Sequence, residues 1–232
     1  MKLRKVFLLI AALLCCTGCA DQTEQAASEP GAVTVPVMEL TLPQQLTESD
    51  LIRQGVEITY ADDFLGRRIR DIDGDFAGFP IENDTDAMKA VASLSDLLGC
   101  KDVYDELRIY RKSETPDFCH YFFVQYYKGL PINSHRTNLH VRADSKRVID
   151  LQNSYFPDLD LNTEPDVSAE AAKKAASASL PGSEFGTPEL IILVHGNTPQ
   201  LVWNFLGTKG EEVQTDAHTG KVLYAFNGIY ED

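Results

Sequence analysis

The apolar positions of this chain change their spacing several times, and each change marks a different predicted element. Val56, Ile58 and Tyr60 alternate with polar residues, as a half-buried strand requires, and a second short strand is predicted to end at Gly74. Over residues 85–98 the apolar residues stand three or four positions apart, which places them along one side of a helix.

Residues 107–152 return to a period of two and are rich in aromatic and β-branched side chains. This pattern is typical of antiparallel strands joined by short polar turns. The strands are predicted at Leu107–Arg111, His120–Tyr127, Leu139–Arg142 and Val148–Gln152. We expect the helix over 85–98 to cover one face of this sheet.

A second pattern of one helix and several strands follows the proline-bounded stretch 157–165. Ser168 is a suitable N-cap for an alanine-rich helix that Pro181 and Gly182 end. Strands are then predicted at Leu190–Val194, Leu201–Phe205, Glu211–Thr215 and Val222–Ala225. The whole pattern predicts an α+β fold of two small modules, each a helix packed on an antiparallel β-sheet.

The first nineteen residues have the pattern of an export signal. A short basic head precedes an apolar run over residues 6–16, which is too short to span a bilayer, and Thr17 and Gly18 precede Cys19. Small residues before a cysteine fit a bacterial lipoprotein signal, in which Cys19 is acylated. An ordinary cleaved secretory peptide is the alternative. We therefore expect a lipoprotein signal peptide over 1–19, a flexible tether over 20–50, and a body anchored to the cell membrane by lipid, outside the cytoplasm.

Charge and cysteine content narrow the class of partner. The formal net charge is −14, which disfavours nucleic acid and charge-driven binding to an anionic membrane. Beyond the signal, only Cys100 and Cys119 remain. Oxidising surroundings would permit a disulfide between them, and two separate buried thiols are the alternative.

The sequence lacks the motifs that carry catalysis. It contains no His-Glu-x-x-His zinc motif, no Gly-x-Ser-x-Gly elbow and no glycine-rich phosphate loop. Cys119 and His120 are neighbours in a predicted strand, so their side chains point to opposite faces and cannot form a dyad. His218 lies in a predicted turn and is interpreted as a turn residue. The acids at 71, 73 and 75 lack the glycine that a calcium loop needs at its sixth position. We expect no enzymatic activity, no metal site and no cofactor.

Five aromatic residues occur between Tyr121 and Tyr127, and two interpretations are open. The first is a central strand that is buried on at least one face. The second is that Tyr121, Phe123 and Tyr127 line an exposed sheet face on which a partner docks, since aromatic side chains anchor interfaces well.

Two segments carry a resemblance to a known family. The first, from His120 to Ile132, is a strand that contains Gln125 and runs into a Gly-x-Pro-Ile turn. The second, from Val213 to Leu223, contains Asp-Ala-His-Thr-Gly-Lys-Val. Together, and in this order, they resemble the propeptides of thermolysin-like and fungalysin-like metalloproteases (FTP), in which the second motif closes a PepSY module. The resemblance covers roughly residues 66–228.

This resemblance implies an architecture and a function. It implies an FTP-like propeptide module over 51–157 with a cystatin-like fold and a PepSY-like module over 166–232. Propeptides of this type template the folding of their protease and cover its cleft. We therefore expect a binding module that acts in trans on a secreted or surface metalloprotease, as an inhibitor or a folding chaperone. A structural or ligand-sensing envelope lipoprotein with no protease partner is the alternative.

Overall fold

A computed structural model describes residues 43–63, 66–195 and 198–229. The expected signal peptide, the lipid-attachment residue Cys19 and the tether up to residue 42 lie outside the described residues. No helix in the described ranges is both long enough and apolar enough to span a membrane.

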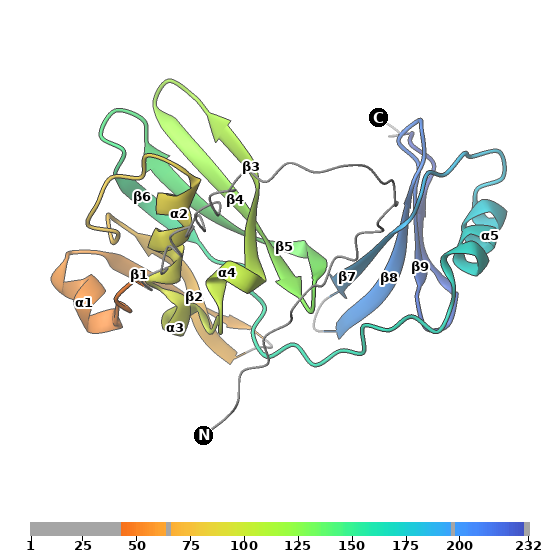
Figure 1. The fold of residues 1–232 in the computed structure, drawn as a ribbon, viewed down its shortest axis with the longest axis horizontal. Coiled ribbons are helices and arrows are strands. Elements are labelled where there is room, and N and C mark those ends of the chain that lie inside the picture. The colour runs from red at the N-terminus through yellow and green to blue at the C-terminus, as the bar shows by residue number, and fades with distance from the viewer. Residues whose placement is uncertain (1–42, 64–65, 196–197, 230–232) are drawn as a thin grey trace, which may run out of the picture. The chain divides into compact units, whose positions relative to one another are not determined.

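Five helices and ten strands occur within the described residues (Figure 1). The helices are α1 (Glu48–Arg53), α2 (Asp84–Ala92), α3 (Ser95–Leu98), α4 (Val103–Glu106) and α5 (Ala169–Ser179). The strands are β1 (Glu57–Asp63), β2 (Gly66–Asp73), β3 (Leu107–Glu114), β4 (Phe118–Tyr127), β5 (Leu130–Arg142), β6 (Val148–Gln152), β7 (Glu189–His195), β8 (Thr198–Leu206), β9 (Glu212–Asp216) and β10 (Val222–Phe226).

The ten strands form one mixed sheet. Its main path runs β1-β2-β6-β5-β7-β8-β9-β10, and β4 pairs with both β3 and β5 beside this path. All strand pairs are antiparallel except β5 with β7, which run parallel where Ile132 lies opposite Ile192. The strand β5 therefore has β4 as a neighbour along most of its length and shares its other side between β6 and β7.

The expected fold of two small helix-on-sheet modules is wrong. The sheet continues from β5 into β7, so the two predicted sheets are parts of a single one. The sequence predicted a strand only at Leu139–Arg142, whereas β5 begins at Leu130. Its first half contains Pro131 and a polar run, which do not show the alternation of a strand, and Ile132 in that half makes the parallel pair.

The helix predicted over 85–98 is interrupted. The structure divides it into α2 and α3, because Gln45 and Leu46 bind the carbonyl groups that a continuous helix would use. The Gln45 side-chain amide donates to the Ala92 carbonyl at 2.8 Å, and the Leu46 N–H donates to the Ser93 carbonyl at 2.8 Å. Gly99 ends α3 with a φ of 73°, the left-handed conformation expected of that position.

The main hydrophobic core lies between α1–α4 and one side of β1–β6. The Tyr121, Phe123, Leu139 and Leu151 side chains belong to it, and each is at most 1% exposed. A second cluster surrounds Ile132 and Ile192 where β5 meets β7, and a third lies between α5 and strands β8 and β9. The middle cluster thus packs the junction that makes the sheet continuous.

Gln125 fixes the chain where it leaves β6. Its side-chain amide donates to the Phe156 carbonyl at 2.8 Å and its side-chain oxygen accepts from the Phe156 N–H at 2.8 Å. A Gln that is 4% exposed thereby satisfies both of its polar groups. A two-residue turn follows β4, in which Lys128 and Gly129 have φ values of 47° and 82°, as type I′ hairpins require.

Candidate functional site

One side of strands β3, β4 and β5 is not covered by the described helices. The buried residues of α1–α4 all belong to the main core, which lies against the other side of these strands. Side-chain alternation along β4 and β5, together with a β-bulge that brings both Tyr110 and Arg111 of β3 to the ring of Phe122, places a set of aromatic and basic residues on the uncovered side, which we call the open face. The open face comprises Arg108, Tyr110 and Arg111 of β3, Phe118, His120, Phe122 and Tyr126 of β4, and Arg136 and His140 of β5.

Three arginines of the open face stack on its aromatic rings. Their guanidinium carbons lie near ring centres in three pairs: Arg108 on Tyr126 at 4.0 Å, Arg111 on Phe122 at 4.1 Å and Arg136 on Tyr110 at 4.3 Å. Such cation–π contacts contribute roughly 0.5–1 kcal/mol each at exposed sites. Stacking holds the guanidinium planes in place and leaves their N–H edges directed away from the rings.

The aromatic rings of the open face also contact one another. Tyr110 meets Phe122 edge-on with ring centres 6.2 Å apart, and His120 lies between Phe118 and Phe122 at 6.0 and 6.3 Å. Tyr110 is 44% exposed and Phe118 is 37% exposed, so part of this row is available to solvent. An exposed row of aromatic rings with stacked arginines has the composition of an interface core, in which aromatic residues and Arg are enriched.

A histidine pair lies in the middle of the open face. His120 and His140 are direct neighbours across β4 and β5, with ring centres 4.7 Å apart. The His140 Nδ1 atom is 2.9 Å from an Asp150 carboxylate oxygen of β6. Burial and, secondarily, the neighbouring His140 lower the pKa of His120. At neutral pH the His120 ring is therefore uncharged.

Beyond β5, the same side of the sheet becomes acidic. Asp150 of β6 lies opposite Asp73 of β2, which in turn lies opposite Glu57 of β1. Burial and then repulsion from Asp150, Asp71 and Glu57 raise the pKa of Asp73. The sheet thus presents a basic and aromatic part over β3–β5 and a separate acidic part over β6, β2 and β1.

A groove adjoins the open face at its β7 end. It has a volume of about 740 Å³, and its lining includes Tyr110 and Arg136 of the open face. Apolar residues contribute much of the remaining lining, among them Val124, Leu130 and Ile191, and the acidic Glu189 of β7 also lines the groove. The groove is therefore continuous with the arginine stacks and offers an apolar surface next to a positive charge.

The three aromatic residues named from the sequence lie elsewhere. Tyr121 and Phe123 are 1% and 0% exposed in the main core, so they present no surface to a partner in this structure. Tyr127 is half-buried against the second cluster, with the Lys128 ammonium 4.9 Å from its ring centre. The alternate residues of the same strand carry the exposed aromatic surface, and the sequence reasoning did not identify them or their arginine partners.

The two cysteines are free thiols in the structure, and the disulfide considered between them is not formed. The Cys100 Sγ atom contacts a Glu106 carboxylate oxygen at 3.4 Å, and the same oxygen accepts the Tyr155 hydroxyl. Burial, with the nearby Glu106 charge, raises the pKa of Cys100 to about 12, and burial raises the pKa of Cys119. Both thiols are therefore protonated at neutral pH and unsuited to act as nucleophiles.

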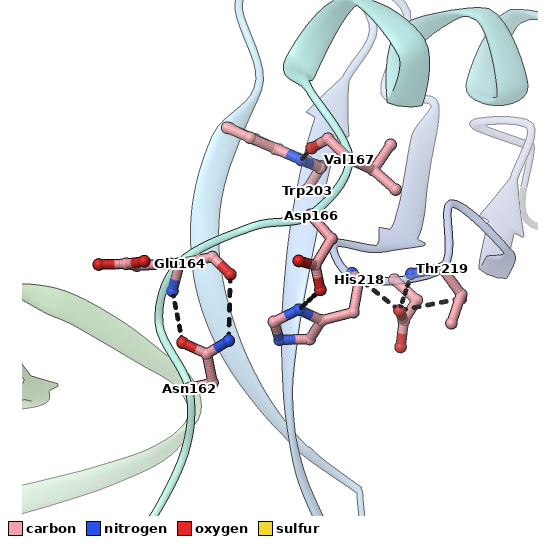
Figure 2. A network of polar contacts seen from close by, with 8 residues as sticks. Asn162, Glu164, Asp166, Val167, Trp203, His218 and Thr219 are labelled. Atoms are coloured by element: carbon pink, nitrogen blue, oxygen red, sulfur yellow. Dashed lines mark hydrogen bonds and ion pairs between the residues drawn. The ribbon is translucent and has the colours of Figure 1, made fainter.

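His218 takes part in holding the segment before α5 against the β9–β10 turn (Figure 2). Its Nδ1 atom lies 2.8 Å from an Asp166 carboxylate oxygen, and the Trp203 indole N–H donates to the Val167 carbonyl at 2.8 Å. Asp216 closes the turn by accepting from the His218 and Thr219 N–H groups at 3.0 and 2.7 Å. Although burial alone would raise it, these hydrogen bonds hold the pKa of Asp216 below its usual value. These contacts explain His218 as a structural residue.

Comparison with known proteins finds distant similarity to solved structures and no family. No protein-family model matches the chain, and no curated protein matches it. Among solved structures, the chain is similar to the Bacillus megaterium YpeB C-terminal domain, with 15% sequence identity and a TM-score of 0.43. The match covers 79% of this chain and 98% of that chain. Similarity at this level supports no functional conclusion, and the metalloprotease-propeptide family stays a prediction from the sequence.

Proposed function

We propose that this chain is a binding module that captures a protein partner on the open face and performs no chemistry on it. The observation that carries this proposal is the cluster of stacked arginines and exposed aromatic rings on a sheet face that the described helices leave uncovered. Aromatic side chains and Arg dominate the binding energy of protein interfaces because they bury large areas with few rotatable bonds.

The lipoprotein pattern at Cys19 predicts the cellular location of this binding module. We propose that acyl chains on Cys19 hold the body outside the cytoplasm, at the surface of the cell membrane. Binding would then occur between a membrane-held chain and a secreted or surface partner. The part of the expected tether that precedes Gln45, whose side chain binds the Ala92 carbonyl, would set the reach of the open face from the membrane.

The partner that the sequence favours is a metalloprotease, which the chain would inhibit or help to fold in trans. Two features of the sequence support this choice: the strand with Gln125 that leads into the turn at Gly129, and the Asp216–Gly220 turn. Both form ordered turns here, the first as a two-residue hairpin turn and the second closed by Asp216. A rigid sheet face can block a cleft by contact alone if it buries the roughly 800 Å² per partner of a standard interface.

The test is to add the purified full chain to secreted metalloproteases from the same source and to measure both complex formation and peptide hydrolysis. We expect a complex on gel filtration, and either slower hydrolysis or faster refolding of the denatured protease. Tyr110→Ala should weaken the complex at least tenfold, as the loss of an interface anchor does. Tyr224→Ala is the matched control, because Tyr224 on β10 has the same exposure of 44% and lies off the open face.

Two results would contradict the proposal. Absence of any complex with the proteases would exclude the metalloprotease as partner. A complex that Tyr110→Ala and Tyr224→Ala weaken equally would exclude the open face as its site. If the native envelope instead yields a partner that is not a protease, and Tyr110→Ala releases it, the chain is a structural or ligand-sensing lipoprotein that uses the same face.

A further inference from the structure

We infer that the open face binds an extended acidic segment of a polypeptide and places an apolar side chain of that segment in the adjoining groove. This inference rests on the proposed binding role and specifies the chemistry of the partner. It is carried by three observations: arginines without acidic partners, the apolar groove beside them, and the restriction of positive charge to one part of the sheet side.

The first observation is that Arg108, Arg111 and Arg136 have no carboxylate partner among the described residues. Other arginines do: the guanidinium groups of Arg53, Arg70 and Arg147 form ion pairs with Asp50, Asp71 and Asp75 respectively. The chain has 35 acidic and 21 basic residues, so unpaired arginines are not explained by a shortage of acids. The open-face arginines are held by aromatic rings instead, which keeps their N–H edges available for a carboxylate from outside.

The spacing of two of these arginines suits an extended chain. Arg111 and Arg136 flank β4 and lie against the same ring, with guanidinium carbons 6.0 and 4.3 Å from the Tyr110 ring centre. Side chains at positions i and i+2 of an extended segment point the same way and stand roughly 7 Å apart. Two carboxylates at such positions can therefore reach both guanidinium groups at once. Arg136 also donates a hydrogen bond to a neutral acceptor, the Asn133 side-chain oxygen, at 3.4 Å.

The groove indicates that the bound segment carries an apolar residue in addition to its acidic residues. Tyr110 and Arg136 line it together with Val124, Leu130 and Ile191, and Glu189 of β7 also lines it. An apolar side chain two positions beyond the second acidic residue points the same way as the carboxylates, would enter the groove and would remove apolar surface from water, which contributes about 25 cal/mol per Å². The preferred segment therefore carries two acidic residues and a large apolar residue at alternate positions.

The acidic part of the sheet argues against a uniformly anionic partner. Asp150, Asp73 and Asp71 continue the same side of the sheet over β6 and β2, and desolvation together with repulsion from Asp150 and Asp71 raises the pKa of Asp73. A phosphate polymer or an anionic membrane laid across the whole side would meet these charges. A polypeptide with a short acidic stretch meets only the arginines, which is why we assign the surface to a polypeptide.

The experiment measures binding of a fluorescein-labelled synthetic peptide, Gly-Ser-Glu-Ser-Glu-Ser-Leu-Ser-Gly, to the purified full chain by fluorescence anisotropy. A second peptide carries Gln in place of each Glu. We expect the Glu peptide to bind at least tenfold more tightly than the Gln peptide. The double variant Arg111→Gln with Arg136→Gln should reduce the affinity for the Glu peptide at least tenfold, since each charge-assisted pair lost weakens binding.

The matched control is Arg67→Gln. The Arg67 guanidinium carbon also stacks on a tyrosine, 4.0 Å from the Tyr60 ring centre, but it belongs to the β1–β2 hairpin. Its substitution should leave the affinity for the Glu peptide within twofold of the unchanged chain. If the double arginine variant does not fold, salt dependence decides: affinity of the unchanged chain should fall severalfold between about 50 and 200 mM salt. Binding that does not respond to salt overturns the inference.

Further probes separate the sources of negative charge. Inorganic polyphosphate and vesicles of phosphatidylglycerol are tested under the same conditions. Tighter binding of either probe, lost in the double arginine variant, would overturn the assignment to a polypeptide. Equal binding of the Glu and Gln peptides would overturn the acidic requirement. If the peptide binds but no metalloprotease complex forms, the acidic-segment inference holds and the metalloprotease is excluded as partner. If a metalloprotease complex forms and the double arginine variant does not weaken it, the proposed partner holds and the acidic-segment inference is overturned.

Discussion

The two sides of β4 carry the same kinds of residues and have opposite roles. On the covered side, Tyr121 and Phe123 pack under the helices, and burial raises the pKa of Tyr121 to about 12. On the open face, Phe118 and Phe122 remain partly exposed, and a guanidinium group stacks on Phe122. The neighbours differ as well: each covered aromatic has an aliphatic residue opposite it on one neighbouring strand, Leu139 for Tyr121 and Ile109 for Phe123, whereas arginines lie opposite Phe118 and Phe122. An aromatic strand can therefore serve the core and an interface at once, one side for each.

The largest difference in stability is expected between the alanine variants of Phe123 and Phe122. Phe123→Ala removes a fully buried ring from the main core and should cost about 3–5 kcal/mol of unfolding free energy, through lost burial and the cavity left behind. Phe122→Ala, one residue away, should cost less than about 1 kcal/mol. Urea unfolding of both variants measures the difference. Equal losses of unfolding free energy would mean that the open face is packed like a second core, and would contradict the difference in role between the two sides of β4.

A smaller difference in stability is expected between substitutions of the buried Gln125 of β4 and the exposed Gln152 of β6. Gln125→Leu removes the partner of both the Phe156 N–H and its carbonyl in a buried position, and should cost about 2–3 kcal/mol. Gln152→Leu, at an exposed position of β6, should change stability by less than about 0.5 kcal/mol. Thermal or urea unfolding compares them. Similar losses of unfolding free energy for the two variants would show that the two hydrogen bonds between Gln125 and Phe156 do not stabilise the fold.

The smallest expected effect concerns the acidic part that borders the open face. The pKa of Asp73 is raised, so its carboxylate is less favourable in the folded than in the unfolded state. This penalty is present at neutral pH and is relieved as pH falls through the raised pKa. Asp73→Asn should therefore raise Tm at pH 7, on the order of 1 °C, and the gain should shrink toward pH 4. Asp160→Asn on the exposed linker serves as control. A lowered Tm at pH 7 would contradict the repulsion inferred among these acids.

Local signals in the sequence predicted many of the elements correctly. The predicted strand Val148–Gln152 has the bounds of β6, and Ser168 caps α5 by accepting from the Ala171 N–H. The first half of β5 and the short helix α4 were missed, because Pro131 and polar residues hide the former and four residues give no periodicity to the latter. Joining the sheet required the single contact of Ile132 with Ile192, which no local pattern reveals.

The open face was missed for a related reason. Alternation separates Phe118 and Phe122 from Tyr121 and Phe123, but it does not say which set faces the core. Strand register settles the question, because it pairs Leu139 with Tyr121 and places Arg111 opposite Phe122. An aliphatic partner on one neighbouring strand distinguishes Tyr121 and Phe123, and an arginine partner distinguishes Phe118 and Phe122. The arrangement of neighbouring strands is therefore the information that the sequence pattern of one strand lacks.

The parallel contact of β5 with β7 has a practical consequence for handling the protein. Cutting the chain in the 157–165 segment would leave the start of β5 around Ile132 with bare N–H and C=O groups, next to the apolar side chains that now pack under Ile192. Such an edge recruits further copies and favours aggregation. We therefore expect a soluble product when strands β5 and β7 are kept on one polypeptide and purification tags are placed away from the β5–β7 contact.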